Sequence, residues 1–396
     1  MQTNTARRSM PKVLVTGGEC RIALAAVRAI GRAGIPAAVI ASAPHAITFT
    51  SRYCTQKILT PPDHHKEDYV GFLTQLVQRQ KFACLLFCDD LPALHVGEFR
   101  DRLLPYVPFL LPPQPWIELS MNKSKMVAFG LDHGIPVPEV MNPKDSSEMR
   151  TFARRVGFPL LVKSNAGDSA KGICIVHSED QLEQAFTDAC ASELQKNIID
   201  LPIVQQFVHG VSYSVLALCD QGALLTFVMM RKIRTFPRWG GNCVEGETVF
   251  DVGLLQAVHQ FLSNIPWTGI LEVEFIQDAH DGRFKLIEFG PDFNWMLDLA
   301  VSSGVNFPLL VYQWMNGVRV PVVSEPCYCV GARFVWFFPE GIRYLYDRPA
   351  SIPKLLLTLF DPHIKTDFFL SDPRALLEQV RQARWGFKKK RAIGFS

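Results

Sequence analysis

The sequence from Gly269 to Asn294, GILEVEFIQDAHDGRFKLIEFGPDFN, decides the fold that we expect. Apolar and acidic residues alternate from Leu271 to Phe275, which is the period of a strand with two unlike faces. A second strand is expected over Phe284 to Phe289. Between them, His280-Asp281-Gly282 suits a three-residue hairpin loop with glycine in the left-handed region.

The register of this hairpin brings two carboxylates together. If it is centred on Asp281, Glu274 lies opposite Glu288, with Cβ atoms roughly 5 Å apart, and like charges at that distance repel. A divalent cation between them removes the repulsion, and Mg²⁺ binds proteins through one or two carboxylates plus phosphate oxygens. The alternative is a solvated strand face on which water screens both charges.

The composition indicates a globular chain of two to three domains. Of 396 residues, 48% are hydrophobic and 20% charged, and the net charge of +3 is too small to indicate nucleic acid or a membrane as the main partner. The ten cysteines show no metal-site spacing, which favours reduced thiols in a cytoplasmic protein. We find neither a signal peptide nor an apolar run of 18 residues, so we expect no membrane partner.

The N-terminal residues have the pattern of an α/β unit. A glycine pair follows the first strand, so Thr16-Gly17-Gly18 either brings backbone N–H groups to an anion or forms a tight turn. Asp89 and Asp90 come at the end of a buried strand, where such sheets bind ligands, or they cap the next helix. The expected elements are strand 12–16, helix 22–33, strand 37–40, helix 69–80 and strand 83–87.

A lysine ends the strand expected over 157–163. Because an isolated buried ammonium is costly, Lys163 needs an anionic partner such as phosphate. The small, Gly-punctuated segment from Ser164 to Gly172 suits a loop that closes over phosphates. Apolar strands are expected over 203–208 and 214–218, and a helix begins at Asn122.

The order of these motifs resembles the ATP-grasp superfamily, especially its carboxylate–amine ligases. The motifs are NKSK at 122–125, GFPLLVK at 157–163, VQQFVHG at 204–210 and the two-glutamate hairpin. The resemblance implies an α/β protein with an ATP-grasp fold and an N-terminal Rossmann-like domain. The implied division is residues 1–115 for that domain, 116–206 for the small ATP-grasp lobe, 207–318 for the large lobe with the metal-binding hairpin, and 319–396 for a C-terminal extension.

The resemblance also implies site residues for ATP and Mg²⁺. Lys123 and Lys163 correspond to the family's two phosphate-binding cations, and Glu274 and Glu288 to its metal-binding carboxylates. The phosphate loop supplies Ser164, Gly167, Ser169 and Gly172, and the adenine hinge supplies Gln206, Phe207 and Val208.

Three positions depart from the family pattern. Ser212 stands where a ribose-binding glutamate is common, and a hydroxyl still bonds to ribose. Gly290 and Asp292 replace the usual Asn and Arg of Glu-x-Asn-Pro-Arg, so a metal ligand is lost and a charge is reversed; Asn294 is a candidate replacement for the missing amide.

The segment from Arg231 to Gly241, which has four cations in its first eight residues and ends in Gly-Gly, is expected to form a loop that clamps phosphate or carboxylate. We assign catalytic roles to Arg231 and Arg234 together with Lys163; the alternative is a solvated basic loop. Glu245 and Glu247 either hold an amine or pair with these arginines.

The C-terminal part is less informative. Helices are expected over 299–305 and 308–314, packed under the hairpin, then a strand over 330–338 and a helix over 373–383. The basic run Lys388 to Arg391 either contacts an acidic partner or is a solvated end.

Together these features predict an ATP-dependent ligase. A carboxylate attacks the γ-phosphate, and an amine then displaces phosphate from the acyl phosphate to form an amide. The alternatives are an ATP-grasp enzyme with another acceptor, as in carboxylases, and a nucleotide-binding or regulatory protein that has lost turnover. The expected partners are a small carboxylate and an amine; nucleic acid is not expected, and a homodimer remains open.

Overall fold

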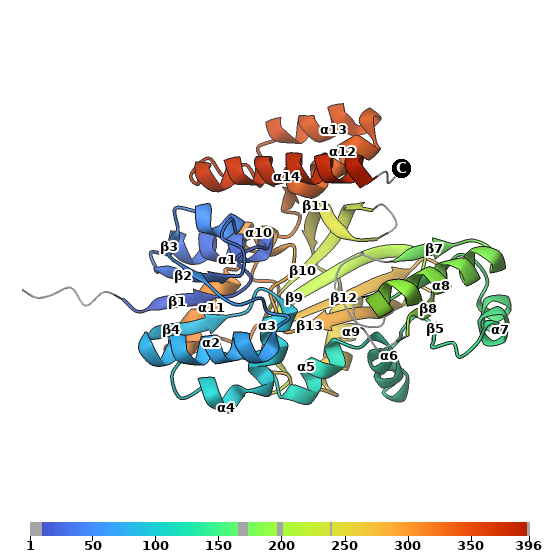
Figure 1. Cartoon of the computed structure of the whole chain (residues 1–396), viewed down its shortest axis with the longest axis horizontal. Coiled ribbons are helices and arrows are strands. Elements are labelled where there is room, and N and C mark those ends of the chain that lie inside the picture. Colours follow the sequence, from blue (N-terminus) through green and yellow to red (C-terminus); the bar gives the residue numbers. More distant parts are fainter. Residues whose placement is uncertain (1–9, 165–172, 196–200, 238–239, 394–396) are drawn as a thin grey trace, which may run out of the picture.

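The computed structural model describes residues 10–164, 173–195, 201–237 and 240–393. Their strands form three sheets (Figure 1). Residues from all three sheets or the loops after them line a cavity. The α/β fold class expected from the sequence is confirmed. No helix in these ranges is both long and apolar enough to cross a membrane.

The N-terminal sheet is parallel, with the order β3-β2-β1-β4. Its central strands are buried because α1 covers one face and α2 the other, as their apolar sequences require. The half-exposed edge strand β3 was not anticipated from the sequence. The elements are β1 (Lys12–Val15), α1 (Arg21–Arg32), β2 (Ala37–Ala41), η1 (Ile47–Thr50), β3 (Cys54–Leu59), α2 (Lys66–Arg79), β4 (Phe82–Leu86), α3 (Asp90–Glu98), α4 (Arg100–Leu103) and α5 (Gln114–Ser120).

The second sheet is small and antiparallel, with the order β5-β8-β6-β7. Apolar side chains of α7 and α8, including Phe152 and Leu182, pack on Leu160 and Val162 of β6. This packing leaves the other face of the sheet toward the cavity. The elements are α6 (Lys123–Asp132), β5 (Val140–Met141), α7 (Ser146–Val156), β6 (Leu160–Lys163), β7 (Cys174–Val176), α8 (Glu179–Gln195) and β8 (Ile203–Gln206).

The third sheet has seven strands in the order β13-β12-β9-β10-β11-β14-β15, antiparallel except for the last pair. Its long central strands carry the largest core of the molecule. The elements are β9 (Gly210–Asp220), β10 (Ala223–Phe236), β11 (Asn242–Val249), α9 (Val252–Leu262), β12 (Gly269–Asp278), β13 (Phe284–Gly290), α10 (Leu297–Ser302) and α11 (Phe307–Met315).

The hairpin has the register predicted from the sequence. Glu274 on β12 pairs with Glu288 on β13, and Gly282 in the turn has a φ of +72°. The three-residue loop was wrong: five residues, 279–283, separate the strands, and Asp278 donates its N–H to the carbonyl of Arg283. Near the turn the pairing is displaced by one residue, with Gln277 opposite Phe284, and a bulge after Glu274 restores the facing pair of Glu274 and Glu288.

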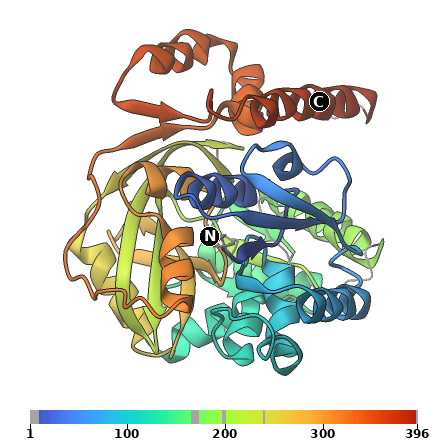
Figure 2. The ribbon, with the colours of Figure 1, turned by 90° about the vertical axis from the view of Figure 1, so that its left-hand side faces the viewer.

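The C-terminal residues continue the third sheet and then cover the N-terminal domain (Figure 2). Two buried ion pairs fasten them to α1: Arg28 to Asp372 at 2.9 Å and Arg21 to Glu340 at 3.2 Å. The elements are β14 (Arg333–Val335), η2 (Phe337–Gly341), α12 (Ile342–Asp347), η3 (Pro349–Ser351), α13 (Ile352–Leu357), η4 (Thr358–Phe360), β15 (Ile364–Thr366) and α14 (Pro373–Ile393).

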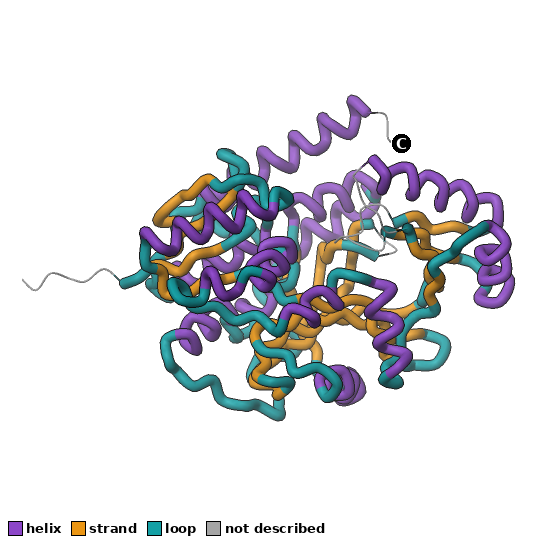
Figure 3. The backbone as a smooth tube through the Cα atoms, turned by 60° about the horizontal axis from the view of Figure 1, so that its bottom comes forward, coloured by secondary structure: helices purple, strands orange, loops and turns teal. Residues whose placement is uncertain are grey.

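Two C-terminal expectations need correction. Helices α10 and α11 pack mainly against α1 and β4 of the N-terminal domain, whereas the hairpin strand β13 is covered by α5, α6 and α9. The last helix, α14, runs ten residues further than predicted. In Figure 3 it lies along the outside of the molecule and leads to the point marked C.

Candidate functional site

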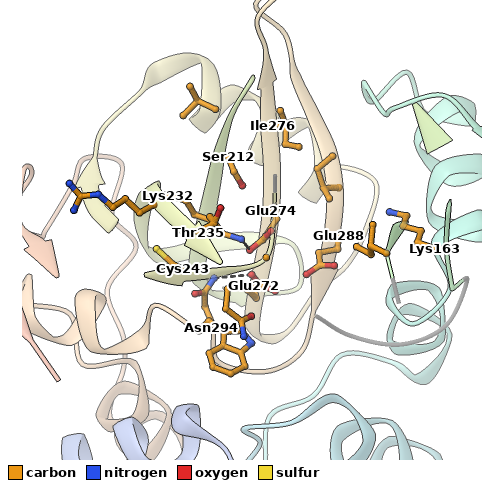
Figure 4. A pocket seen from close by; sticks show the side chains of 18 of the residues that line it. Lys163, Ser212, Lys232, Thr235, Cys243, Glu272, Glu274, Ile276, Glu288 and Asn294 are labelled. Atoms are coloured by element: carbon orange, nitrogen blue, oxygen red, sulfur yellow. Dashed lines mark hydrogen bonds and ion pairs between the residues drawn. The ribbon is translucent and has the colours of Figure 1, made fainter. Parts of the chain in front are cut away.

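A cavity of about 770 Å³ opens between the three sheets. The small sheet contributes β6, the large sheet contributes β9, β10, β12 and β13, and the N-terminal domain contributes the residues after β4. Figure 4 shows side chains from both lobes pointing into the same space. The predicted residues that line it are Lys123, Lys163, Phe207, Val208, Ser212, Arg234, Glu274 and Glu288.

Other predicted residues are placed differently. Gln206 ends β8 and its N–H donates to the carbonyl of Glu139 at 2.8 Å, while its neighbour Gln205 lines the cavity. Ser164 directly follows Lys163 but is not part of the lining. Three residues expected in the phosphate loop lie outside the described residues: Gly167, Ser169 and Gly172.

Lys163 ends β6 with its side chain buried, as the apolar strand before it requires. Burial and, to a smaller extent, the nearby charge of Lys123 lower the pKa of Lys163 to about 7, although Glu288 partly opposes both effects. Figure 4 shows Lys163 facing Glu288 across the space between the lobes. A cation held in this way gains most from an anion that enters the cavity.

Glu274 and Glu288 enter the cavity from adjacent strands (Figure 4). Burial raises the pKa of Glu274, Lys232 lowers it, and Glu288 raises it. No group of three or more His, Cys, Asp and Glu side chains in the described ranges could hold a metal ion. A pair of carboxylates nevertheless fits Mg²⁺ when phosphate oxygens complete the coordination, so Glu274 and Glu288 would hold the ion together with a nucleotide.

Lys232 on β10 was not singled out from the sequence. Its ammonium forms an ion pair with Glu274, and it is 11% exposed. Burial lowers the pKa of Lys232, but the charge and hydrogen bond of Glu274 raise it by more, so the pKa is above its usual value. Lys232 therefore offsets part of the repulsion between Glu274 and Glu288, for which the sequence analysis had considered only a metal ion or water. The one sequence feature that could have placed Lys232 on a strand face is that it precedes the apolar Ile233.

The predicted loop at 231–241 was wrong for its first six residues, which are the end of β10. Arg231 forms an ion pair with Glu247 and does not line the cavity. Arg234 lines the cavity and binds Glu245, which is fully buried and also binds Arg333. The sequence left two alternatives for Glu245 and Glu247, holding an amine or pairing with the arginines. The structure shows the pairing.

The departure at Gly290 creates room for two carboxylates. A Cβ on Gly290 would lie 3.2 Å from Oδ1 of Asp90 and 3.3 Å from Oδ1 of Asp292. Burial raises the pKa of Asp292, and the charges of Asp90 and Glu272 raise it further. The cavity thus has an acidic end, formed partly by the N-terminal domain, where the familiar motif would present an arginine.

Asn294 fixes one carboxylate of this acidic end. Its amide nitrogen donates to Glu272 at 2.8 Å and to the hydroxyl of Ser214, and its oxygen accepts from the N–H of Met296. Asn294 lines the cavity, but both ends of its amide are engaged within the protein. These contacts indicate that Asn294 positions Glu272, and they leave neither end of its amide for a metal ion.

The turn after β1 is packed tightly. Gly17 has a φ of +66°, and a Cβ on Gly18 would lie 2.8 Å from Cγ1 of Val39. None of Thr16, Gly17 and Gly18 lines the cavity, which favours the turn over an anion site. Asp89 stands at the N-cap of α3 without a side-chain capping bond and lines the cavity, as Asp90 does.

Comparison with known proteins agrees with this geometry. Residues 121–293 match the family model described as an ATP-grasp domain. The chain is 24% identical over 208 residues to the D-alanine–D-alanine ligase of Pseudomonas fluorescens, which covers 49% of this chain and 61% of that one. It is 23% identical over 308 residues to the carbamoyl phosphate synthase large chain of Thermomicrobium roseum, covering 71% of this chain but 27% of that one.

Among solved structures, the fold is similar to the biotin carboxylase of Campylobacter jejuni in complex with an ATP analogue. The TM-score is 0.64 at 16% identity, and the match covers 83% of this chain and 75% of that one. At this identity the likeness concerns the fold alone. It extends beyond residues 121–293, so the surrounding domains share the architecture.

Proposed function

This chain belongs to the ATP-grasp superfamily, and from that premise we propose that it is an ATP-dependent ligase that joins a carboxylate to an amine through an acyl phosphate. The observation that carries the proposal is the convergence of Lys163 with Glu274 and Glu288 on one cavity between the lobes. Catalysis of phosphoryl transfer consists mainly of positioning and charge neutralisation, for which these groups are suited.

The nucleotide phosphates would lie between Lys163 and the two glutamates. Lys163 and Lys123 neutralise phosphate oxygens, and Glu274 and Glu288 would hold Mg²⁺, which when bound would neutralise further charge on the transferred phosphoryl group. Phe207 and Val208 line the part of the cavity beyond β8, where the adenine would sit, and Ser212 follows on β9. In the first step, a carboxylate oxygen bonds to the γ-phosphorus while the bond to the ADP oxygen breaks.

The second step needs an amine near the acyl phosphate. An amine enters as an ammonium ion, and beside Asp90, Asp292 and Glu272 it would offset the repulsion that raises the pKa of Asp292 and so favour the ionised carboxylate. The raised pKa of Asp292 suits a group that accepts the proton which the ammonium loses. The amine nitrogen then bonds to the acyl carbon, and inorganic phosphate leaves. This assignment gives Asp292 a function in place of the missing arginine.

Trapping of the acyl phosphate tests the proposal. The full chain is incubated with Mg-ATP, pools of small carboxylic acids and hydroxylamine, which converts acyl phosphates into hydroxamates. We expect a hydroxamate from at least one acid and none when ATP is omitted. If ADP accumulates with bicarbonate while every acid pool gives no hydroxamate, the carboxylase-like alternative replaces this proposal.

The second candidate, a nucleotide-binding protein without turnover, is favoured by one observation: Gly290 provides no side-chain ligand at the end of β13. Its signature is an ATP-dependent rise in melting temperature with no ADP from any pool.

A further inference from the structure

Exposed apolar side chains concentrate in the C-terminal part of the molecule. Of the 22 large hydrophobic residues that are exposed in the described ranges, eight lie between Ile352 and Leu377. Single exposed apolar residues are normal on protein surfaces, but a concentration of them marks an interaction site. This concentration plays no part in the cavity between the sheets.

Five of the eight lie within residues 352–360, on α13 and the η4 turn that follows it, and we call them the α13 face. Leu355 and Thr358 point inward and are buried, and Leu355 belongs to the small C-terminal core with Ala383 of α14. The residues around them are exposed, with Leu357 at 66% and Phe360 at 82%. In Figures 1 and 2, α13 is the outermost element at the top of the molecule. The α13 face consists of Ile352, Leu356, Leu357, Leu359 and Phe360.

The part of the sequence that contains the α13 face has an excess of positive charge. Residues 319–396 contain thirteen Lys and Arg against seven Asp and Glu, whereas residues 1–318 contain 28 and 31. Lys354 on α13 and Lys365 on β15 are exposed, and three of the acidic residues, Glu340, Asp367 and Asp372, are buried.

We propose that the α13 face and its basic surroundings bind the surface of an anionic lipid bilayer. Apolar side chains flanked by Lys and Arg are the combination that places a segment in the interface, where the apolar groups enter the acyl boundary and the cations contact lipid phosphates. This goes beyond the proposed function and revises the expectation, based on the small net charge and on the lack of a long apolar run, that the protein has no membrane partner.

Charge decides between this partner and the alternatives. A second copy docked through the same face would bring two basic surfaces together, which opposes association. A nucleic acid would engage the cations, but it would leave the leucines of the α13 face in water. An anionic bilayer satisfies both the charge and the apolar groups.

The position of the face also relates it to the cavity. Tyr344 and Arg348, on and just after α12, line the cavity, and α12 precedes α13 by only a short turn. A bilayer bound at the α13 face would therefore lie against the same C-terminal segment that closes part of the cavity.

Vesicle binding tests the proposal with the full chain. Sedimentation with phosphatidylserine-containing vesicles at low salt is compared with sedimentation with pure phosphatidylcholine vesicles. We expect binding to the anionic vesicles only. The double variant Leu357→Asp/Phe360→Asp should weaken it at least roughly tenfold, because two apolar groups leave the interface and two negative charges enter it. Leu131→Asp on α6, at 69% exposure, is the matched control and should bind like the parent.

Each other outcome overturns the proposal. If the parent chain does not bind anionic vesicles, the proposal is wrong. The melting temperature of the double variant is measured as a control, because an unchanged value shows that a loss of binding does not come from unfolding. If the parent forms a dimer by light scattering that Leu357→Asp/Phe360→Asp dissociates, the face joins two copies. If a basic-residue variant, Lys354→Glu/Lys365→Glu, loses binding to single-stranded RNA while vesicles never bind, the partner is a nucleic acid.

Discussion

Replacement of Lys163 by methionine should remove a proton uptake that accompanies ATP binding. In the nucleotide-free protein, burial holds the pKa of this lysine at about 7, so much of the population is neutral at physiological pH. A phosphate beside the amine favours the charged form and raises its pKa, so binding must draw a proton from the solution.

The amount of this uptake follows from the pKa. With a free pKa of about 7 and full protonation in the complex, linkage gives an uptake of roughly 0.1 proton at pH 6, 0.5 at pH 7 and 0.9 at pH 8. ATP affinity should therefore fall roughly fivefold between pH 7 and 8 and by nearly tenfold per pH unit above pH 8. Because unfolding would restore the ordinary lysine pKa of 10.5, this group makes the nucleotide-free protein more stable as pH rises from about 7 to 10.5.

Isothermal titration calorimetry measures the uptake directly. ATP is titrated at pH 8 in buffers of different ionisation enthalpy, and the slope of the observed heat against that enthalpy gives the number of protons. We expect about 0.9 proton for the parent and a value near zero for Lys163→Met. Lys125→Met, on the exposed side of α6, is the control and should keep the uptake. Equal uptake by the parent and Lys163→Met would refute this account of the lysine.

Further predictions concern the glutamates and the domain contact. Glu288→Gln should lower ADP release at least roughly 100-fold with little change in melting temperature, and a rate within twofold of the parent contradicts its role. Lys232→Met removes the cation that keeps its partner carboxylate ionised, so the acid limb of the pH–rate profile should move upward by about one unit or more; an unmoved limb argues against this pairing. Arg28→Met leaves Asp372 buried without its cation and should cost about 3–5 kcal/mol in urea unfolding, against under about 1 kcal/mol for Arg32→Met, whose guanidinium is exposed; equal losses would contradict the role of the buried pair.

The sequence predicted the parts of the site that depend on local patterns. The alternation around Glu274 and the complementary run at Glu288 set the hairpin register, and an apolar strand that ends at Lys163 made a buried cation predictable. These inferences needed only the strand period and the cost of burying charge.

What the sequence could not predict depends on long-range pairing. The segment from Arg231 to Phe236 has too many cations for a typical strand, yet it continues β10 because Glu245 and Glu247 on β11 neutralise the arginines. Lys232 meets Glu274 only because other strands of the sheet bring them together. The approach of Asp90 to Asp292 likewise depends on how the N-terminal domain packs against the large sheet.

The most direct test of the central claim is ADP release with Mg-ATP against paired pools of small carboxylic acids and amines, with Glu288→Gln as the inactive control. We expect ADP release by the parent chain that requires both an acid and an amine, with an amide as the product. Absence of ADP from every pair, while ATP still raises the melting temperature, would contradict it and identify a nucleotide-binding protein without ligase activity.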